Sequence, residues 1–224
     1  MADGPTTLDG PRLAPAAGGT PRRLVILLHG LGADGNDLIG LGQVWRALLP
    51  ETAFVSPNAP FPCDMAPFGR QWFSLQDRTP ARLLAAVRQV APVLDAFIDA
   101  EMARCGVGPA ETALVGFSQG TMMALYAAPR RAAALAAVVG YSGRLIGGET
   151  LAADVAGRPP ILLAHGTADE IVPFDSLATA AAGLEAAGLT VETLTRPGLG
   201  HGIDEPCLQA GGAFLARHLA NRDL

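Results

Sequence analysis

TALVGFSQG, residues 112–120, joins a short apolar run to a glycine-rich turn. Within it, Gly116-Phe117-Ser118-Gln119-Gly120 has the pattern G-x-S-x-G, and a helical pattern follows over 119–128. A serine held in a tight turn between a strand and a helix has a strained backbone, so its neighbours must be small. We therefore expect Ser118 at a helix N-terminus, where amide N–H groups favour a developing anion. The alternative is an ordinary turn in which Ser118 only caps the helix.

Similar short runs recur along the chain, with helical patterns between them. Unbroken apolar runs are typical of strands that helices cover on both faces, as in a parallel sheet. Strands are expected at 24–28, 53–55, 112–115, 135–139, 161–164 and 191–194, and helices at 37–49, 80–105, 119–128, 176–187 and 206–220. The alternation predicts an α/β fold, a mostly parallel, doubly wound sheet with helices on both faces. Ligands bind beyond the carboxyl ends of such strands, which makes the residues after each run candidates for function.

The helix expected at 80–105 has the clearest boundaries. Thr79 is a candidate N-cap, Pro80 occupies the first helical position and Gly106 follows the end. One apolar stripe runs along it, made of Leu83, Val87, Val90, Leu94 and Phe97. Pro92 lies inside the pattern, and we expect it to kink or divide the helix.

Length and composition favour a single globular domain. The 224 residues are half hydrophobic and 17% charged, which is far from a disordered composition. We expect a catalytic domain over 21–224, preceded by an arm over 1–20 that is loose or forms an edge strand. The net charge is −5, so the surface does not suit nucleic acid or anionic membranes.

The remaining composition signals concern the compartment. The three cysteines, Cys63, Cys105 and Cys207, are widely spaced and form no CxxC pair, which argues against a disulfide scaffold or a zinc site. No apolar run reaches the roughly 18 residues of a membrane helix, and residues 1–23 lack the pattern of a signal peptide. The expected location is the cytoplasm.

Ser118 needs a base and an orienting carboxylate, and two other post-strand loops offer them. His201 lies in the glycine-rich loop 198–202, beyond the strand at 191–194. Asp169 and Glu170 follow the strand at 161–164, and either could orient the imidazole. Asp175 is more suited to capping the next helix. The order Ser, Asp, His is that of α/β-hydrolases and predicts nucleophilic acyl-transfer chemistry.

Acyl transfer also needs donors for the developing oxyanion. HGLGADG, residues 29–35, follows the first strong strand and can turn backbone amides toward Ser118. We assign the donors to the backbone N–H groups of Leu31 and Gln119. A dinucleotide site is the alternative for this loop, but its glycine spacing does not match G-x-G-x-x-G.

These motifs resemble the phospholipase/carboxylesterase family of α/β-hydrolases, which includes acyl-protein thioesterases. The resemblance covers 23–218 and rests on LHGLGADG (28–35), SPNAP (56–60), RQWFSL (70–75), VGFSQG (115–120), AHGTADEIVP (164–173) and GLGHGID (198–204). It places the nucleophile on Ser118, the acid on Asp169 and the base on His201, with oxyanion donors at Leu31 and Gln119. It therefore selects Asp169 over Glu170.

The resemblance implies hydrolysis of small carboxylic esters, in some members of thioesters or lysophospholipids, without a cofactor. The segment 59–75 resembles the family's loop beside the acyl chain, with five candidate contacts: Phe61, Met65, Phe68, Trp72 and Phe73. No insertion is long enough for a large lid, and exposed aromatics in this loop could support a homodimer. Two alternatives remain, a serine peptidase on the same fold and a catalytically silent ligand-binding module.

Overall fold

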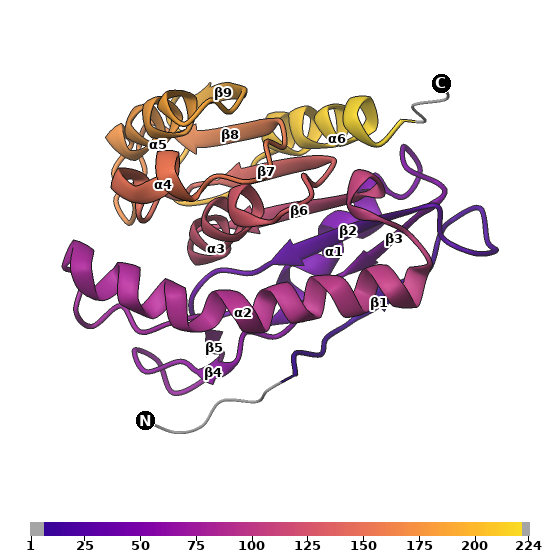
Figure 1. Cartoon of the computed structure of the whole chain (residues 1–224), viewed down its shortest axis with the longest axis horizontal. Helices are drawn as coiled ribbons and strands as arrows, with labels where there is room; N and C mark the ends of the chain where they lie inside the picture. The colour runs from indigo at the N-terminus through magenta and orange to yellow at the C-terminus, as the bar shows by residue number, and fades with distance from the viewer. Residues whose placement is uncertain (1–6, 221–224) are drawn as a thin grey trace.

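Strand β6 lies at the middle of the sheet around which the chain is built. The computed structural model describes residues 7–220, and its seven-stranded sheet has the order β1-β3-β2-β6-β7-β8-β9 (Figure 1). The strands span Arg12–Leu13 (β1), Arg23–Leu28 (β2), Thr52–Val55 (β3), Thr112–Phe117 (β6), Ala137–Tyr141 (β7), Ile161–Gly166 (β8) and Val191–Arg196 (β9). All neighbours pair in parallel except β1, which runs antiparallel to β3. The expected mostly parallel α/β fold is confirmed.

Two hydrophobic cores lie on opposite faces of this sheet. In β2, Leu24, Ile26 and Leu28 face one core, while Val25 and Leu27 face the other. The first core packs against α2 (Pro80–Cys105), α3 (Gln119–Ala127), α4 (Gly148–Asp154) and α5 (Asp175–Ala186), and the second against α1 (Gly35–Trp45) and α6 (Glu205–Leu219). This alternation in a fully buried strand is why its sequence reads as an unbroken apolar run. No helix within residues 7–220 combines the length and apolarity needed to cross a bilayer.

The boundaries of the elements differ from expectation in several places. The strand expected at 135–139 is shifted to Ala137–Tyr141, and α1 ends at Trp45 instead of 49. Helix α4, two 3₁₀ turns (Pro109–Glu111 and Ala128–Arg130) and the hairpin of β4 (Phe61–Pro62) and β5 (Arg70–Gln71) were not expected. Asp175 is the first residue of α5 and does not cap it with its side chain. Part of the N-terminal arm is the edge strand β1, and residues 1–6 and 221–224 lie outside the described residues.

Helix α2 runs unbroken through Pro92, so the expected division of the helix is wrong. The buried stripe of its sequence holds it against the sheet, and Figure 1 shows it crossing the near side of the molecule. Pro92 lies on the exposed face, where water can satisfy the carbonyl that loses its helical partner. The C-terminus is as expected, because Gly106 adopts a left-handed conformation with φ 69° and its N–H bonds back into the last turn.

The turn from β6 to α3 has almost no free space. Ser118 has φ 52° and ψ −114°, a conformation that side chains rarely adopt. A Cβ on Gly120 would lie 1.8 Å from the carbonyl oxygen of Leu28, and one on Gly116 would lie 2.4 Å from the amide nitrogen of Thr121. Both glycines are therefore required for α3 to begin directly against the end of β2.

The loop that follows β2 is held by a buried histidine. His29 is fully buried, with Nδ1 2.7 Å from the carbonyl oxygen of Gly30 and Nε2 3.0 Å from the amide nitrogen of Ala59. These contacts fit a neutral ring that donates from Nδ1 and accepts at Nε2. Burial lowers the pKa of His29 and favours this neutral form.

The close approach at Gly120 predicts a large effect of one methyl group. Gly120→Ala must displace backbone, so we expect a loss of about 3 kcal/mol in the free energy of unfolding. Gly40→Ala in α1 is the matched control, because nothing lies within 4 Å of its added Cβ. The control should leave stability unchanged or raise it by about 0.5–1 kcal/mol. Urea unfolding measures both, and equal effects would contradict the packing described.

The buried state of His29 predicts a pH-dependent stability. Below about pH 6.5 the unfolded chain binds a proton at this ring that the folded chain resists. The stabilisation from neutral His29 is therefore complete above that pH and is lost as pH falls toward its depressed folded pKa. His29→Gln keeps an acceptor for Ala59 and does not titrate, so its melting temperature should fall less between pH 7 and pH 5. Identical slopes in wild type and variant would refute this role.

Candidate active site

Ser118 lies at the carboxyl end of β6 and at the N-terminus of α3. Its amide donates a hydrogen bond to the carbonyl oxygen of Tyr141 over 2.9 Å, which fixes the turn against the end of β7. The residue is buried, yet it lines a cavity of about 450 Å³. Its hydroxyl is therefore in a recess large enough for a small ligand.

His201 and Asp169 meet beside this cavity. The Nδ1 atom of His201 lies 2.8 Å from Oδ2 of Asp169, and the imidazole is 4.9 Å from the ring of Phe117. His201 lines the same cavity as Ser118. His201 and Asp169 are therefore in contact, and His201 and Ser118 border one cavity, with the three residues coming from loops after β6, β8 and β9, whereas Glu170 is exposed to solvent.

The environment of Asp169 keeps its carboxylate charged. Its side chain is fully buried, and burial alone would raise its pKa. Hydrogen bonds from His201 and from the amides of Val172 and Ile171 outweigh this effect, and the pKa of Asp169 lies below its usual value. A charged carboxylate at Nδ1 holds the imidazole with its other nitrogen as the acceptor.

A second histidine reaches the same carboxylate. The Nε2 atom of buried His165, from β8, lies 3.1 Å from Oδ2 of Asp169 and 2.9 Å from the carbonyl oxygen of Val172. Both neighbours are acceptors, so the geometry requires a proton on Nε2. His165 thus helps to hold Asp169 in place, a contact that sequence reasoning did not identify.

The loop between β2 and α1 lies directly against Ser118. A Cβ on Gly30 would sit 3.4 Å from the Cβ of Ser118, and Gly30 and Leu31 both line the cavity. The backbone of Gln119 begins α3, next to Ser118. Leu31 therefore borders the same cavity as Ser118, and Gln119 is the serine's neighbour in the chain, while their role as oxyanion donors stays a prediction.

The five side chains expected to contact substrate lie outside the cavity lining. Trp72 and Phe73 are core residues, and the Trp72 indole N–H donates to the carbonyl oxygen of His29 over 2.9 Å. Met65 and Phe68 are 50% and 73% exposed near the tip of the β4–β5 hairpin, and Phe61 packs partly against the first core. None of these five side chains lines the cavity, and Leu75 is the residue of segment 59–75 that does.

The side chain of Gln119 explains why the aromatic segment turns inward. Its Oε1 accepts from the Trp72 amide over 2.8 Å, and its Nε2 donates to the Phe73 carbonyl over 2.7 Å. The hairpin also bonds to the loop after β2, through Gly32 to Arg70 and Arg70 to Ala33, both over 2.8 Å. These bonds bury the rings beneath the loop rather than beside a ligand.

Leu75 and residues of several other segments form the cavity wall. Besides the residues already named, the lining consists of Leu75, Arg78, Phe117, Met122, Arg144, Val172, Pro173 and Ile171. Arg144 follows the end of β7, so the rule of inspecting residues after each strand could have found it. The other residues have no sequence signal of their own, because their place depends on how the loops fold.

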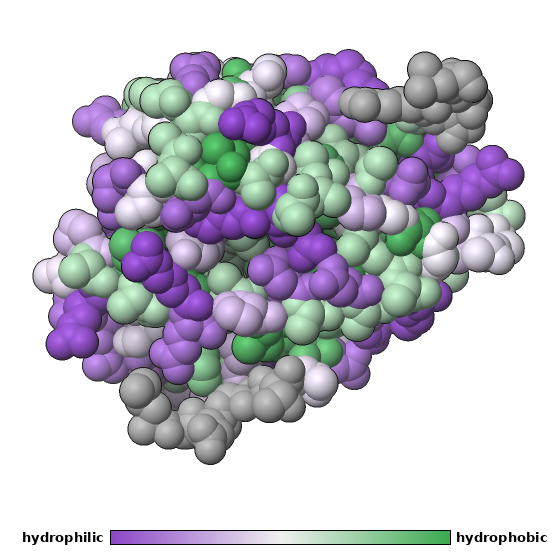
Figure 2. All heavy atoms as spheres, in the orientation of Figure 1, coloured by the Kyte–Doolittle hydropathy of each residue, from purple (hydrophilic) through white to green (hydrophobic). Residues whose placement is uncertain are grey.

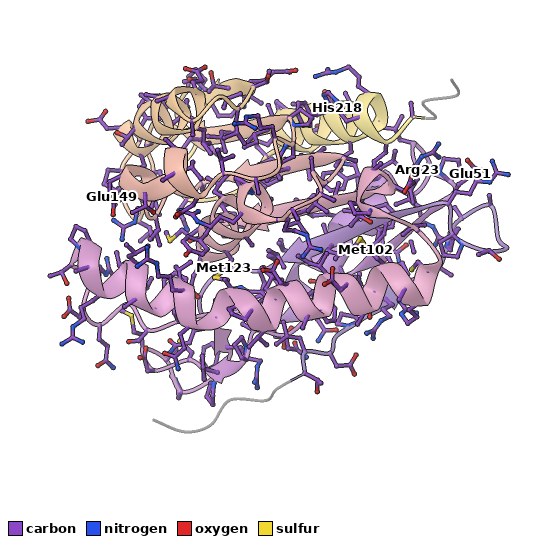
Figure 3. All side chains as sticks on the ribbon, viewed as in Figure 1. Arg23, Glu51, Met102, Met123, Glu149 and His218 are labelled. Atoms are coloured by element: carbon purple, nitrogen blue, oxygen red, sulfur yellow. The ribbon has the colours of Figure 1, made fainter. Side chains whose placement is uncertain are left out.

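The cavity opens at the end of the sheet where the parallel strands finish. Figure 3 labels Glu149, from α4, at this end, while Arg23 and Glu51, which form a 3.1 Å ion pair, lie at the opposite end where β2 starts. Across residues 7–220, no group of three or more His, Cys, Asp or Glu side chains could hold a metal ion. The cavity is thus at the position expected for a ligand of an α/β sheet.

Comparisons with known proteins agree with this geometry. Residues 15–219 match the phospholipase/carboxylesterase family model. The chain is 30% identical over 188 residues to esterase YpfH of Escherichia coli. This match covers 84% of this chain and 79% of that protein. It is 31% identical over 224 residues to carboxylesterase SOBER1 of Arabidopsis thaliana, and that match covers 88% of this chain and 91% of the relative.

Solved structures show the same similarity in three dimensions. The crystal structure of esterase PE8 is 44% identical, covers 95% of this chain and all of its own, and superposes with a TM-score of 0.91. The structure of Arabidopsis thaliana SOBER1 covers 88% of this chain and 99% of its own, at 28% identity and a TM-score of 0.79. This chain is therefore a member of the phospholipase/carboxylesterase family, an α/β-hydrolase of the esterase and thioesterase type.

Proposed function

We propose that this protein hydrolyses carboxylic esters through a covalent acyl-enzyme, with Ser118 as nucleophile, His201 as base and Asp169 as the orienting acid. The observation that carries the proposal is the 2.8 Å contact between Asp169 and His201 on a cavity that Ser118 also lines. A catalytically silent binding module would have no need of a charged carboxylate held against this imidazole. Membership of an esterase family supports the same assignment.

The reaction proceeds in two matched halves. His201 takes the proton of Ser118 while the hydroxyl oxygen attacks the ester carbonyl, and the amides of Leu31 and Gln119 bind the resulting oxyanion. The tetrahedral intermediate then expels the alkoxide, which receives its proton from His201. Water repeats the steps on the acyl-enzyme: His201 takes a proton from water, and the acid is released with Ser118 restored.

Small esters with short to medium acyl chains fit the cavity. Its volume of about 450 Å³ lies within the range of sites for small organic ligands. Leu75, Met122 and Ile171 provide apolar wall for an acyl chain. Acyl thioesters share the reacting carbonyl and are included in the proposal, as are lysophospholipids with chains of similar length. The expected homodimer and cytoplasmic location stay predictions.

Removal of the nucleophile is the direct test. Ser118→Ala should lower kcat for a 4-nitrophenyl ester by about 10⁶ and abolish covalent labelling by an organophosphate, measured by intact mass. Ser142→Ala is the control, because Ser142 also has positive φ and follows the neighbouring strand, yet it does not line the cavity. That variant should still be labelled. Label retained by Ser118→Ala would reject the nucleophile, and equal turnover of a matched amide would indicate a peptidase.

Variants of the adjacent acids Asp169 and Glu170 distinguish a specific catalytic role from a general effect of charge. Asp169→Asn should reduce kcat by a factor on the order of 10³–10⁴, because the amide no longer stabilises the imidazolium. Glu170→Gln removes the same charge from the next, exposed residue and should change kcat by less than about twofold. Steady-state rates at one pH compare the pair. A similar loss in both variants would argue against Asp169 as the orienting acid.

A further inference from the structure

Two arginines face the cavity that contains Ser118 and His201. Arg144 lies in the loop after β7 and Arg78 in the loop before α2, and both line this cavity. The loop of Arg144 passes close to the nucleophile, since a Cβ on Gly143 would lie 3.1 Å from the carbonyl oxygen of Ser118. Two cationic residues therefore border the recess of the reacting groups, Arg144 half-buried and Arg78 exposed.

Neither arginine has a counterion within residues 7–220. No carboxylate of this range forms an ion pair with Arg78 or Arg144, whereas Arg130 pairs with one carboxylate and Arg12 and Arg131 with two each. Asp77, the acid nearest in sequence, accepts hydrogen bonds from Thr79 and lies 3.8 Å from Arg82. Other described arginines also form no ion pair, among them Arg88 and Arg158, so what distinguishes Arg78 and Arg144 is that both line the cavity.

Arg144 carries its charge in a less favourable environment than water. The side chain is partly buried, and burial lowers its pKa, with the charge of Arg78 lowering it further. Arg78 is held nearby by a 3.1 Å hydrogen bond from its Nε to the carbonyl oxygen of Leu75. Groups that are unfavourable for stability are common where a ligand supplies the missing partner.

The two guanidinium groups also border a second, smaller hollow of about 140 Å³. Pro80, Leu83 and Ile146 form its apolar wall, and exposed Glu149 stands on its rim. Figure 2 shows hydrophilic residues around this end of the molecule, near the start of α2. A ligand whose ester carbonyl lies at Ser118 and that extends toward the smaller hollow would therefore pass both arginines.

We propose that Arg78 and Arg144 form a subsite for an anionic group, a carboxylate or phosphate, on the ester substrate. Guanidinium groups bind such oxyanions through paired N–H donors, and two of them converging on one recess match one anionic group. The protein then prefers esters that bear a negative charge at a distance from the reacting carbonyl. This inference rests on the proposed function and adds the charge of its substrate.

The test compares charged and neutral substrates of equal length. The charged set consists of mono-4-nitrophenyl esters of dicarboxylic acids, with the carboxylate methylated in the neutral set. A third set is 4-nitrophenyl esters of acids ending in a phosphate, which distinguishes the two anions. We expect kcat/KM to favour one charged set by roughly tenfold at one chain length, and the preference to weaken as salt is added.

Variants assign this preference to the arginines. Arg144→Gln should bring the ratio of charged to neutral kcat/KM close to one, Arg78→Gln should reduce it, and Arg144→Lys should retain part of it. Arg82→Gln is the matched control, since Arg82 is exposed, lies one helical turn beyond Arg78 and does not line either hollow. That variant should keep the wild-type ratio. Arg144→Gln should also melt no lower than wild type, because the arginine has no ion-pair partner in the described part of the chain to lose.

Each outcome bears on a distinct claim. If wild type hydrolyses neutral esters through Ser118 without preferring either charged set, the anion subsite is refuted and the proposed function stands. A preference that persists in Arg144→Gln, or that disappears equally in Arg82→Gln, also refutes the subsite. If no ester is turned over, the proposed function itself fails.

Discussion

The close approach of two backbones, at Gly120 and the carbonyl oxygen of Leu28, governs the geometry of this molecule. A side chain at Gly120 would push α3 away from the end of β2. With glycine there, α3 starts against the same strand end from which the loop of Gly30 and Leu31 departs. The serine at the head of the helix and the amides of the loop are then neighbours, although about 90 residues separate them in sequence.

Gln119 joins this turn to the aromatic segment that precedes α2. Its backbone stands beside Ser118, while its side chain occupies both a donor and an acceptor of the Trp72–Phe73 backbone. The rings of Trp72 and Phe73 are therefore core residues, and the wall of the cavity comes from the loops after β2, β5, β7, β8 and β9 and from the turn that begins α3. Substitutions in the aromatic segment should act on the site through the position of the β2–α1 loop, without contacting a ligand.

Much of this arrangement is predictable from sequence because it depends on local patterns. The apolar runs mark buried strands, Thr79 to Gly106 delimit α2, and the residues after three strands include Ser118, Asp169 and His201. The choice between Asp169 and Glu170, however, needs the direction of two adjacent side chains, which periodicity does not reveal. The aromatic residues illustrate the same limit. Trp72 is held in the core by hydrogen bonds to His29 and Gln119, which are 43 and 47 positions away in sequence. Arg78 and Arg144 meet only through the fold.

The last strand, β9, bears on how the protein behaves toward other molecules. It pairs with β8 alone among the described strands, and its residues are all half-buried or exposed. Glu192 and Arg196 on this strand are engaged by Arg217 and Asp204 of the α6 region over 2.8 and 2.9 Å. Charged, occupied side chains along an open margin oppose the addition of a strand from another molecule. The charged side chains on this edge strand thus oppose sheet extension and aggregation in concentrated solution.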